Sequence, residues 1–300
     1  MLYDLPAPAK LNLFLHVVGR RADGYHLLES LFRLITLSDA VTIDLRTDGV
    51  ISREPCSTVD WPEADDLTIR AAKALQQATG TRTGAHISIR KRIPAGGGLG
   101  GGSSDAATVL LGLNRLWRTD LTRKQLMVLG LPLGADVPFF LFGQSAFVTG
   151  IGEQFQPVTI PERSYLVTQP NANVPTPTIF AAADLTRNSE PVKISDFSGL
   201  NRAMVRFTGS DAFGRNDLEA VVKRLFPAVS STQQWLATQG VVSRLTGSGA
   251  CLFSEFSNPR EAVFAYEQLV AKMQFEQGDL KTVHVCDGLP IHPMQNWAVD

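Results

Sequence analysis

Six glycines fall within the seven residues Gly96–Gly102, inside the stretch P-A-G-G-G-L-G-G-G-S-S-D-A-A of residues 94–107. Fixing a glycine costs more backbone entropy than fixing any other residue, so such a run is either a flexible linker or a loop whose backbone must approach something closely. Residues 85–89 alternate apolar and polar side chains as a strand does, and residues 106–117 repeat apolar side chains at helical spacing. These periodic flanks favour a loop with a fixed structure over a linker.

The order of strand, glycine loop and helix predicts an anion site. Backbone N–H groups of such a loop and of a helix N-terminus point toward a ligand placed there, and the helix dipole favours negative charge. We expect Ser103, Ser104 and Asp105 to supply cap-type side chains where the helix begins. The stretch is therefore predicted to hold the phosphates of a ligand.

Three familiar phosphate loops do not fit this stretch. Gly96, Gly98 and Gly101 match G-x-G-x-x-G, but a dinucleotide fold wants an acidic residue about twenty positions on, at the end of a second strand, and Asp120 falls between two expected helices. No Gly-Lys-Ser/Thr follows the glycines, as the Walker pattern requires. A protein-kinase glycine loop joins two strands, whereas a helix follows here. The sequence therefore indicates a loop-helix phosphate site of another kind.

Composition indicates a globular protein of one large or two medium domains. The chain has 300 residues, 44% of them hydrophobic, and a net charge of −1, so we expect neither nucleic acid nor an anionic membrane as a partner.

Its most apolar early stretch, Leu11–Val18, is too short for a signal peptide or a membrane span. Cys56, Cys251 and Cys286 form no C-x-x-C pair, which indicates reduced thiols in a cytoplasm. The histidines lack H-E-x-x-H spacing, and we expect no protein-held zinc.

Periodicity predicts an α+β protein, because strands and helices do not alternate strictly as they do in βαβ units. Strands are expected at residues 10–18, 27–37, 40–45, 85–89, within 143–161, and at 165–168, 241–245, 251–256 and 282–286. Helices are expected at residues 66–79, 106–117, 217–225, 228–238 and 259–273, with another short one behind a capping box of Thr122 and Gln125. The stretch with Pro170, Pro175 and Pro177 is expected to be a loop.

Two polar residues stand out against this pattern. Lys10 and Asn12 alternate with leucines in the first expected strand, so the two side chains should lie on one face, which could also be an ordinary solvated face. Asp136 lies in the apolar run G-A-D-V-P-F-F-L-F, where a buried carboxylate needs a cation. The alternative is that Asp136 only caps the short element that follows it.

Together these segments resemble a known kinase superfamily. The glycine loop, P-A-K-L-N-L-F-L at Pro8–Leu15 and G-S-G-A at Gly247–Ala250 are similar to the three motifs of the galactokinase, homoserine kinase, mevalonate kinase and phosphomevalonate kinase superfamily. More narrowly, R-A-D-G-Y-H at Arg21–His26, L-G-A-D-V-P at Leu133–Pro138 and P-T-P at Pro175–Pro177 resemble the 4-diphosphocytidyl-2-C-methyl-D-erythritol kinases. The resemblance runs from about residue 7 to residue 290, with the motifs in the family's order.

The resemblance implies a cytoplasmic enzyme of the non-mevalonate isoprenoid pathway. With ATP and Mg²⁺ it would phosphorylate the 2-hydroxyl of a small substrate that carries a cytidine diphosphate group, as a monomer or homodimer. The family's catalytic pair falls on Lys10 and Asp136, and its cytidine pocket falls on Tyr25, His26 and Phe180, with Asn12 and Thr176 nearby. Its ATP loop falls on Pro94, Ala95, Gly96, Gly97, Gly98, Leu99, Gly100, Gly101, Gly102, Ser103 and Ser104.

The resemblance also implies two domains with the active site between them. Residues 1–160 would form an ATP-binding domain like domain 2 of ribosomal protein S5, and residues 161–300 a ferredoxin-like domain that completes the substrate site. The chain departs from the common pattern in two places. Gly101 and Gly102 stand where many superfamily members carry serines, and Asp66 stands where relatives carry asparagine near the adenine.

Two other functions are compatible with the motifs. A sister kinase would use another alcohol, but mevalonate or homoserine would not need the aromatic residues Tyr25, His26 and Phe180. A non-catalytic nucleotide-binding regulator would not need both Lys10 and Asp136. Both features favour the kinase that acts on a cytidine diphosphate substrate.

Overall fold

The computed structural model describes residues 1–55, 62, 65–192, 215–273 and 279–300, so Cys56 lies outside the described part. Two long antiparallel strands, β1 (Leu2–Arg20) and β2 (His26–Arg46), run through the molecule and pair from Leu2 with Ile43 to Arg20 with His26. A tight turn joins them, in which the Arg21 N–H donates to the Tyr25 carbonyl.

The expectation of two separate strands at residues 27–37 and 40–45 is wrong, because β2 is continuous. One edge of β2 pairs with β1. Along its other edge, β2 pairs first with β5 (Ala146–Thr149), then with β10 (Leu280–Leu289) and then with β4 (Gly84–Arg90). The polar Asp39 does not interrupt the strand, since its carboxylate accepts the backbone N–H groups of Arg92 and Ile93 at 2.5 and 2.8 Å.

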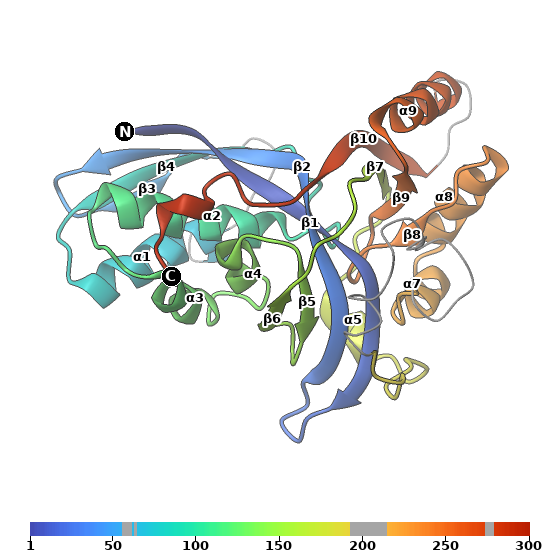
Figure 1. The fold of residues 1–300 in the computed structure, drawn as a ribbon, viewed down its shortest axis with the longest axis horizontal. Coiled ribbons are helices and arrows are strands. Elements are labelled where there is room, and N and C mark those ends of the chain that lie inside the picture. Colours follow the sequence, from blue (N-terminus) through green and yellow to red (C-terminus); the bar gives the residue numbers. More distant parts are fainter. Residues whose placement is uncertain (56–61, 63–64, 193–214, 274–278) are drawn as a thin grey trace.

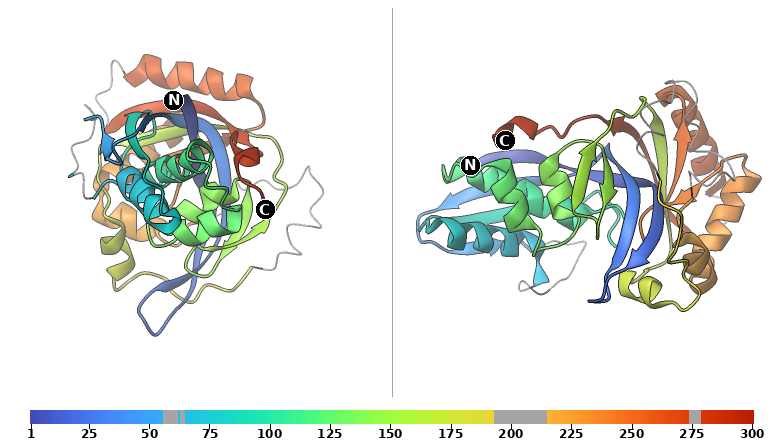
Figure 2. Two further views of the ribbon diagram at one scale, coloured as in Figure 1. Left: turned by 90° about the vertical axis from the view of Figure 1, so that its left-hand side faces the viewer. Right: turned by 60° about the horizontal axis from the view of Figure 1, so that its bottom comes forward.

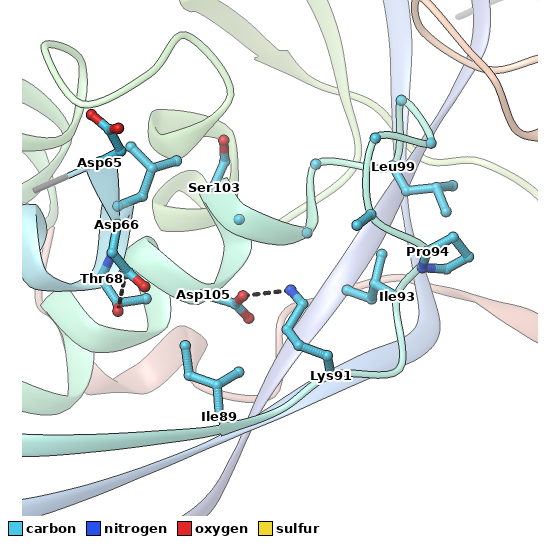
Figure 3. A pocket seen from close by; sticks show the side chains of 18 of the residues that line it. Asp65, Asp66, Thr68, Ile89, Lys91, Ile93, Pro94, Leu99, Ser103 and Asp105 are labelled. Atoms are coloured by element: carbon cyan, nitrogen blue, oxygen red, sulfur yellow. Dashed lines mark hydrogen bonds and ion pairs between the residues drawn. The ribbon is translucent and has the colours of Figure 1, made fainter. Parts of the chain in front are cut away.

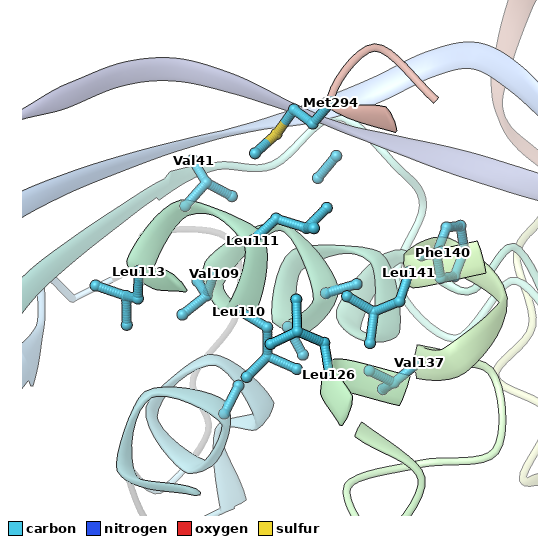
Figure 4. Packing of buried hydrophobic residues seen from close by; sticks show 14 of the residues in the cluster. Val41, Val109, Leu110, Leu111, Leu113, Leu126, Val137, Phe140, Leu141 and Met294 are labelled. Carbon is cyan, nitrogen blue, oxygen red and sulfur yellow. The ribbon is translucent and has the colours of Figure 1, made fainter. Parts of the chain in front are cut away.

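Helices α1 (Leu67–Thr79), α2 (Gly101–Leu116), α3 (Arg123–Gly130) and α4 (Val137–Phe142) pack beside the sheet in the first half of the chain (Figure 1). A short strand, β3 (Ile51–Arg53), pairs in parallel with β4 at the edge. Figure 4 shows α2 at the centre of this core, with Leu110, Leu126 and Leu141 among the fully buried side chains. The capping box of Thr122 and Gln125 at α3 is confirmed.

The second half of the chain forms four antiparallel strands in the order β10–β7–β9–β8, with β7 at Ser164–Pro170, β9 at Leu252–Phe256 and β8 at Arg244–Leu245. Helices α7 (Glu219–Leu225) and α8 (Pro227–Thr238) connect β7 to β8, and α9 (Pro259–Met273) connects β9 to β10. This is the ferredoxin-like arrangement. The predicted α+β fold with two domains is confirmed.

The two halves lie side by side along the long axis of the molecule (Figure 2). They share one sheet, because Gly288 and Leu289 at the end of β10 pair with Ile35 and Leu34 of β2. A short hairpin of β5 and β6 (Gln154–Pro157) joins the same sheet. The last residues cross back to the first half, where Met294 is buried and the 3-10 helix Gln295–Trp297 lies. A domain boundary at residue 160 stays a prediction.

Residues 176–181, expected as part of a proline-rich loop, form the short helix α5 (Thr176–Ala181). Pro175 occupies its N-cap position and Pro177 its first turn. Proline is tolerated there because the first N–H groups of a helix have no partner within the helix. In the part of the chain that the structure describes, no helix has the length and apolar character needed to cross a bilayer.

Candidate active site

The glycine loop between β4 and α2 lies where the two halves of the molecule meet. Its Gly96 and Gly97 carbonyls accept the N–H groups of Ala250 and Cys251, each at 3.2 Å, and its Leu99 carbonyl accepts the N–H of Lys10 at 3.0 Å. The three segments that resemble the superfamily motifs are therefore in direct contact, although they are far apart in sequence. The resulting site is built from both halves of the chain.

Gly98 explains why the loop needs glycine. Its φ is +75°, a conformation that residues with a Cβ rarely adopt, and a Cβ there would lie 2.4 Å from the Thr246 carbonyl oxygen. The backbone at Gly98 can lie against the turn after β8 only because no side chain separates them. At this position the glycine is required by close approach of two backbones.

A cavity of about 420 Å³ opens on one side of the loop (Figure 3). The loop forms one wall, and most of the other residues come from the start of α1 and the end of β4, with Arg53 from β3 and Asp105 from α2. Asp66 caps α1 by accepting the Thr68 N–H at 2.8 Å, and its other oxygen pairs with Arg53 at 2.7 Å. Both oxygens of this carboxylate are thus engaged within the protein.

The expectation that Ser103, Ser104 and Asp105 cap α2 is wrong. Gly100 is the N-cap residue, in the left-handed conformation with φ +73°, and no side chain caps the helix. Ser104 is buried and donates to the Pro8 carbonyl at 2.7 Å, while Asp105 points toward Lys91. The helix N–H groups thus remain free of side-chain caps, as a phosphate site requires.

Lys91, at the end of β4, contacts two buried carboxylates beneath the loop. Its Nζ lies 2.5 Å from Asp39 Oδ2 and 2.7 Å from Asp105 Oδ2. Asp105 Oδ1 is buried without a hydrogen-bond partner. Burial, opposed by the charge of Lys91 and reinforced by that of Asp39, raises the pKa of Asp105 to about 7. This cluster ties β2, β4 and α2 together at the two ends of the loop.

Replacing Asp105 by asparagine is expected to change how stability depends on pH. Because the pKa of Asp105 is raised from 3.8 to about 7 in the folded chain, folding takes up a proton between these values, and this group's contribution to stability falls as pH rises. Wild type should therefore gain free energy of unfolding relative to Asp105→Asn on acidification from about pH 7 to about pH 5. Urea unfolding at both pH values measures the difference. Equal pH slopes for the two proteins would contradict the shift.

A second cavity of about 340 Å³ shares Gly96, Gly98, Gly100 and Ser103 with the first, so the loop lies between the two. Lys10 Nζ lies 3.5 Å from Asp136 Oδ2, and both residues line this second cavity. The ammonium also donates to Asn12 Oδ1 at 2.6 Å. It lies 4.4 Å from the centre of the Phe32 ring.

These contacts decide between the alternatives for Lys10 and Asp136. Lys10 is 4% exposed and Asn12 is 2% exposed, so their shared face is not a solvated one. Asp136 occupies the N-cap position of α4 but makes no side-chain cap hydrogen bond, so the capping interpretation is wrong. Its carboxylate is partly exposed and faces Lys10 at the mouth of the cavity.

Of the residues predicted to bind the cytidine, Asn12, Thr176 and Phe180 line the second cavity, whereas Tyr25 and His26 do not, although His26 contacts Phe180. The rings of His26 and Phe180 are 5.0 Å apart and tilted by 31°, and the neighbouring Tyr25 is exposed. Thr176 Oγ1 lies 2.6 Å from the hydroxyl of Ser248 in the G-S-G-A segment. No sequence pattern singled out Ser248, although it lies inside a recognised motif, or Arg187, whose Nε donates to His26 Nε2 at 3.1 Å.

Comparison with known proteins shows to which family the chain belongs. The family model for the GHMP kinases N terminal domain matches residues 66–144, and the model for the GHMP kinases C terminal domain matches residues 182–274. A 4-diphosphocytidyl-2-C-methyl-D-erythritol kinase of Bordetella parapertussis is 54% identical, over 99% of this chain and 98% of that protein. The kinase of the same name from Aromatoleum aromaticum is 47% identical, over 99% and 97%.

Solved structures give the same result. A crystal structure of 4-(cytidine 5'-diphospho)-2C-methyl-D-erythritol kinase is 33% identical with a TM-score of 0.74 and covers 95% of this chain and 98% of that one. The Methanococcus jannaschii mevalonate kinase, 14% identical with a TM-score of 0.64, covers 95% and 98% and shares the fold. This chain belongs to the 4-diphosphocytidyl-2-C-methyl-D-erythritol kinase family of the GHMP kinases.

Proposed function

We propose that this chain transfers the γ-phosphoryl group of ATP to the 2-hydroxyl of 4-diphosphocytidyl-2-C-methyl-D-erythritol. The observation that carries the proposal is the Lys10–Asp136 pair, 3.5 Å apart in the second cavity, which the glycine loop separates from the first. ATP would occupy the cavity beside α1 and β4, and the alcohol substrate the cavity that holds the pair. The loop between them is where the phosphoryl group would pass.

The glycine loop supports binding of the ATP phosphates. Backbone N–H groups at the uncapped start of α2 carry partial positive charge, and the loop has no side chains that would keep phosphates away from them. Phosphoryl transfer has a loose transition state, so its catalysis depends mainly on positioning and on charge stabilisation. Fixed backbone N–H groups supply both.

Asp136 and Lys10 would act on the acceptor hydroxyl. Asp136 is partly exposed and lines the second cavity, and it would accept the proton of the substrate hydroxyl as that hydroxyl oxygen attacks phosphorus. Lys10 would attract the γ-phosphate toward the acceptor, because its ammonium lies beside Asp136 in the same cavity. Asn12 holds the ammonium in place through its 2.6 Å hydrogen bond.

Mg²⁺ would offset the negative charge of the phosphates. The described residues contain no group of three or more acidic, histidine or cysteine side chains able to hold a metal by themselves. A site with few protein ligands suits Mg²⁺, because this ion keeps most of its waters and binds through substrate phosphates and one or two protein oxygens. Ser103, which lines both cavities, is the protein group that would hold it.

The base pocket and the cellular setting complete the proposal. Stacking on Phe180 or Tyr25 selects little among bases, so hydrogen bonds near His26 must discriminate cytosine. The free thiols of Cys251 and Cys286 fit a reducing cytoplasm. We propose that the chain works there as a monomer or homodimer, without nucleic acid.

An ADP-release assay with a panel of acceptors tests the proposed function. We expect turnover with 4-diphosphocytidyl-2-C-methyl-D-erythritol and none above background with mevalonate or homoserine, which lack a base for the aromatic residues. The uridine analogue should be a poor substrate, because uracil has an acceptor at position 4 and a donor at N3, where cytosine has a donor and an acceptor. Turnover of the uridine form within about threefold of the cytidine form, less than about 1 kcal/mol, would refute the base pocket. Turnover of mevalonate would assign the chain to a sister activity.

A further inference from the structure

Arg187 connects the end of α5 to the first residue of β2. Its Nε donates to His26 Nε2 at 3.1 Å. Its Nη2 donates to the carbonyls of Phe180 and Ala182 at 3.1 and 2.6 Å, and its Nη1 donates to the Leu185 carbonyl at 3.1 Å. No described carboxylate lies within ion-pair distance of this guanidinium, so these four acceptors are what hold it.

These contacts make one guanidinium responsible for the shape of two segments. The last carbonyls of a helix have no partner within the helix. In α5, the carbonyls of Phe180 in the last turn and of the C-cap residue Ala182 accept hydrogen bonds from Arg187. The same group bonds to the ring of His26. It therefore fixes where Phe180 stands relative to His26, with ring centres 5.0 Å apart.

The hydrogen bond from Arg187 also fixes the tautomer of the His26 ring. A guanidinium has only donors, so His26 Nε2 must accept, and the ring must carry its proton on Nδ1. The charged groups that act on the ring are Arg187 and Arg20, the latter at the end of β1. Burial, Arg187 and Arg20 all lower the pKa of His26.

We infer that Arg187 is a positioning residue for the nucleobase of the substrate: it holds His26 with Nε2 as an acceptor and places Phe180 beside it. The inference rests on the proposed function, because it concerns the base that this pocket would bind. Arg187 does not line either cavity in the described structure, and it acts through His26 and α5. Loss of Arg187 should therefore weaken binding of the cytidine diphosphate substrate and leave the phosphoryl-transfer step intact.

Replacing Arg187 by methionine tests this. The KM for the cytidine diphosphate substrate should rise about 10-fold or more, the effect expected for loss of a charged hydrogen bond, while kcat and the KM for ATP stay within about twofold. Without Arg187 the pKa of His26 should return toward about 6.5, so this KM should rise on acidification from about pH 8 to about pH 6 in the variant only. Arg224→Met is the matched control, because Arg224 is an exposed arginine of α7 that pairs with Asp184.

In the double variant Arg187→Met/His26→Gln, the KM for the cytidine diphosphate substrate should no longer depend on pH. If Arg187→Met only damaged the structure, removing His26 would not abolish that dependence. If Arg187→Met does not fold, NMR titration of the wild-type His26 ring decides instead. It should show a proton on Nδ1 and a pKa below about 6.5. An unchanged KM in the variant, or a wild-type His26 that is protonated at Nε2, overturns the inference. Absence of turnover in wild type would instead refute the proposed function, while the titration still tests the contact.

Discussion

Asp136→Asn is expected to lower kcat by a factor of about 10²–10⁴, the contribution typical of a general base, and to leave the KM values of both substrates nearly unchanged. Asparagine keeps the shape of the side chain and its hydrogen bonds but cannot accept the proton. Because Asp136 makes no cap hydrogen bond to α4, its replacement should not disturb that helix. Steady-state and single-turnover kinetics, with thermal melting as a check on folding, measure the effect.

The partner Lys10 makes the test sharper. Lys10→Ala should also lower kcat, and the double variant should lose much less than the sum of the two effects, because residues that act as a unit are not additive. Asp184→Asn, which removes an exposed carboxylate paired with Arg224, should leave kcat unchanged. If Asp136→Asn keeps more than about a third of kcat while chemistry limits the rate, Asp136 only positions the acceptor. The γ-phosphate itself would then take the proton.

The sequence predicted those features of the site that break a local pattern. Lys10 and Asn12 were visible because polar side chains interrupted an apolar strand, and Asp136 because it lay in an apolar run. Polar residues in otherwise apolar segments are expected at functional sites, because there the chemistry of the site, and not local folding preference, determines the residue. The pairing of Lys10 with Asp136 across 126 positions is not a local property, and only the family resemblance indicated it before the structure showed the 3.5 Å contact.

The sequence misled where a tertiary contact reversed a local preference. Asp105 has a cap-type side chain at a helix start, but the buried ammonium of Lys91 binds it instead. Asp39 would normally favour a break between strands, yet three donors from residues 91–93 hold it inside β2. No pattern in the sequence indicated Arg187, because it follows the short helix α5, whose prolines had led us to expect a loop. In each case the deciding partner is distant in sequence.

Gly98→Val is expected to abolish the rise in melting temperature that ATP produces and to reduce turnover by at least about 100-fold. A valine Cβ at φ +75° is strained, and it would lie 2.4 Å from the Thr246 carbonyl and 3.1 Å from the Gly249 N. The loop would have to move away from the turn after β8. Its hydrogen bonds to Ala250 and Cys251 would then weaken, and its N–H groups would no longer point toward the phosphates.

Gly102→Ala is the matched control, because it also adds a Cβ to the glycine run but has space for it. Gly102 lies in the first turn of α2 without positive φ, and the atom nearest to its Cβ would be Leu67 Cδ1 at 3.6 Å. It should therefore keep the shift in melting temperature that ATP produces. A Gly98→Val protein that folds and keeps the full shift would show that the loop does not hold ATP. Global unfolding of Gly98→Val would instead mean that the glycine serves the contact between the two halves of the molecule, because the backbone that faces Gly98 belongs to the second half.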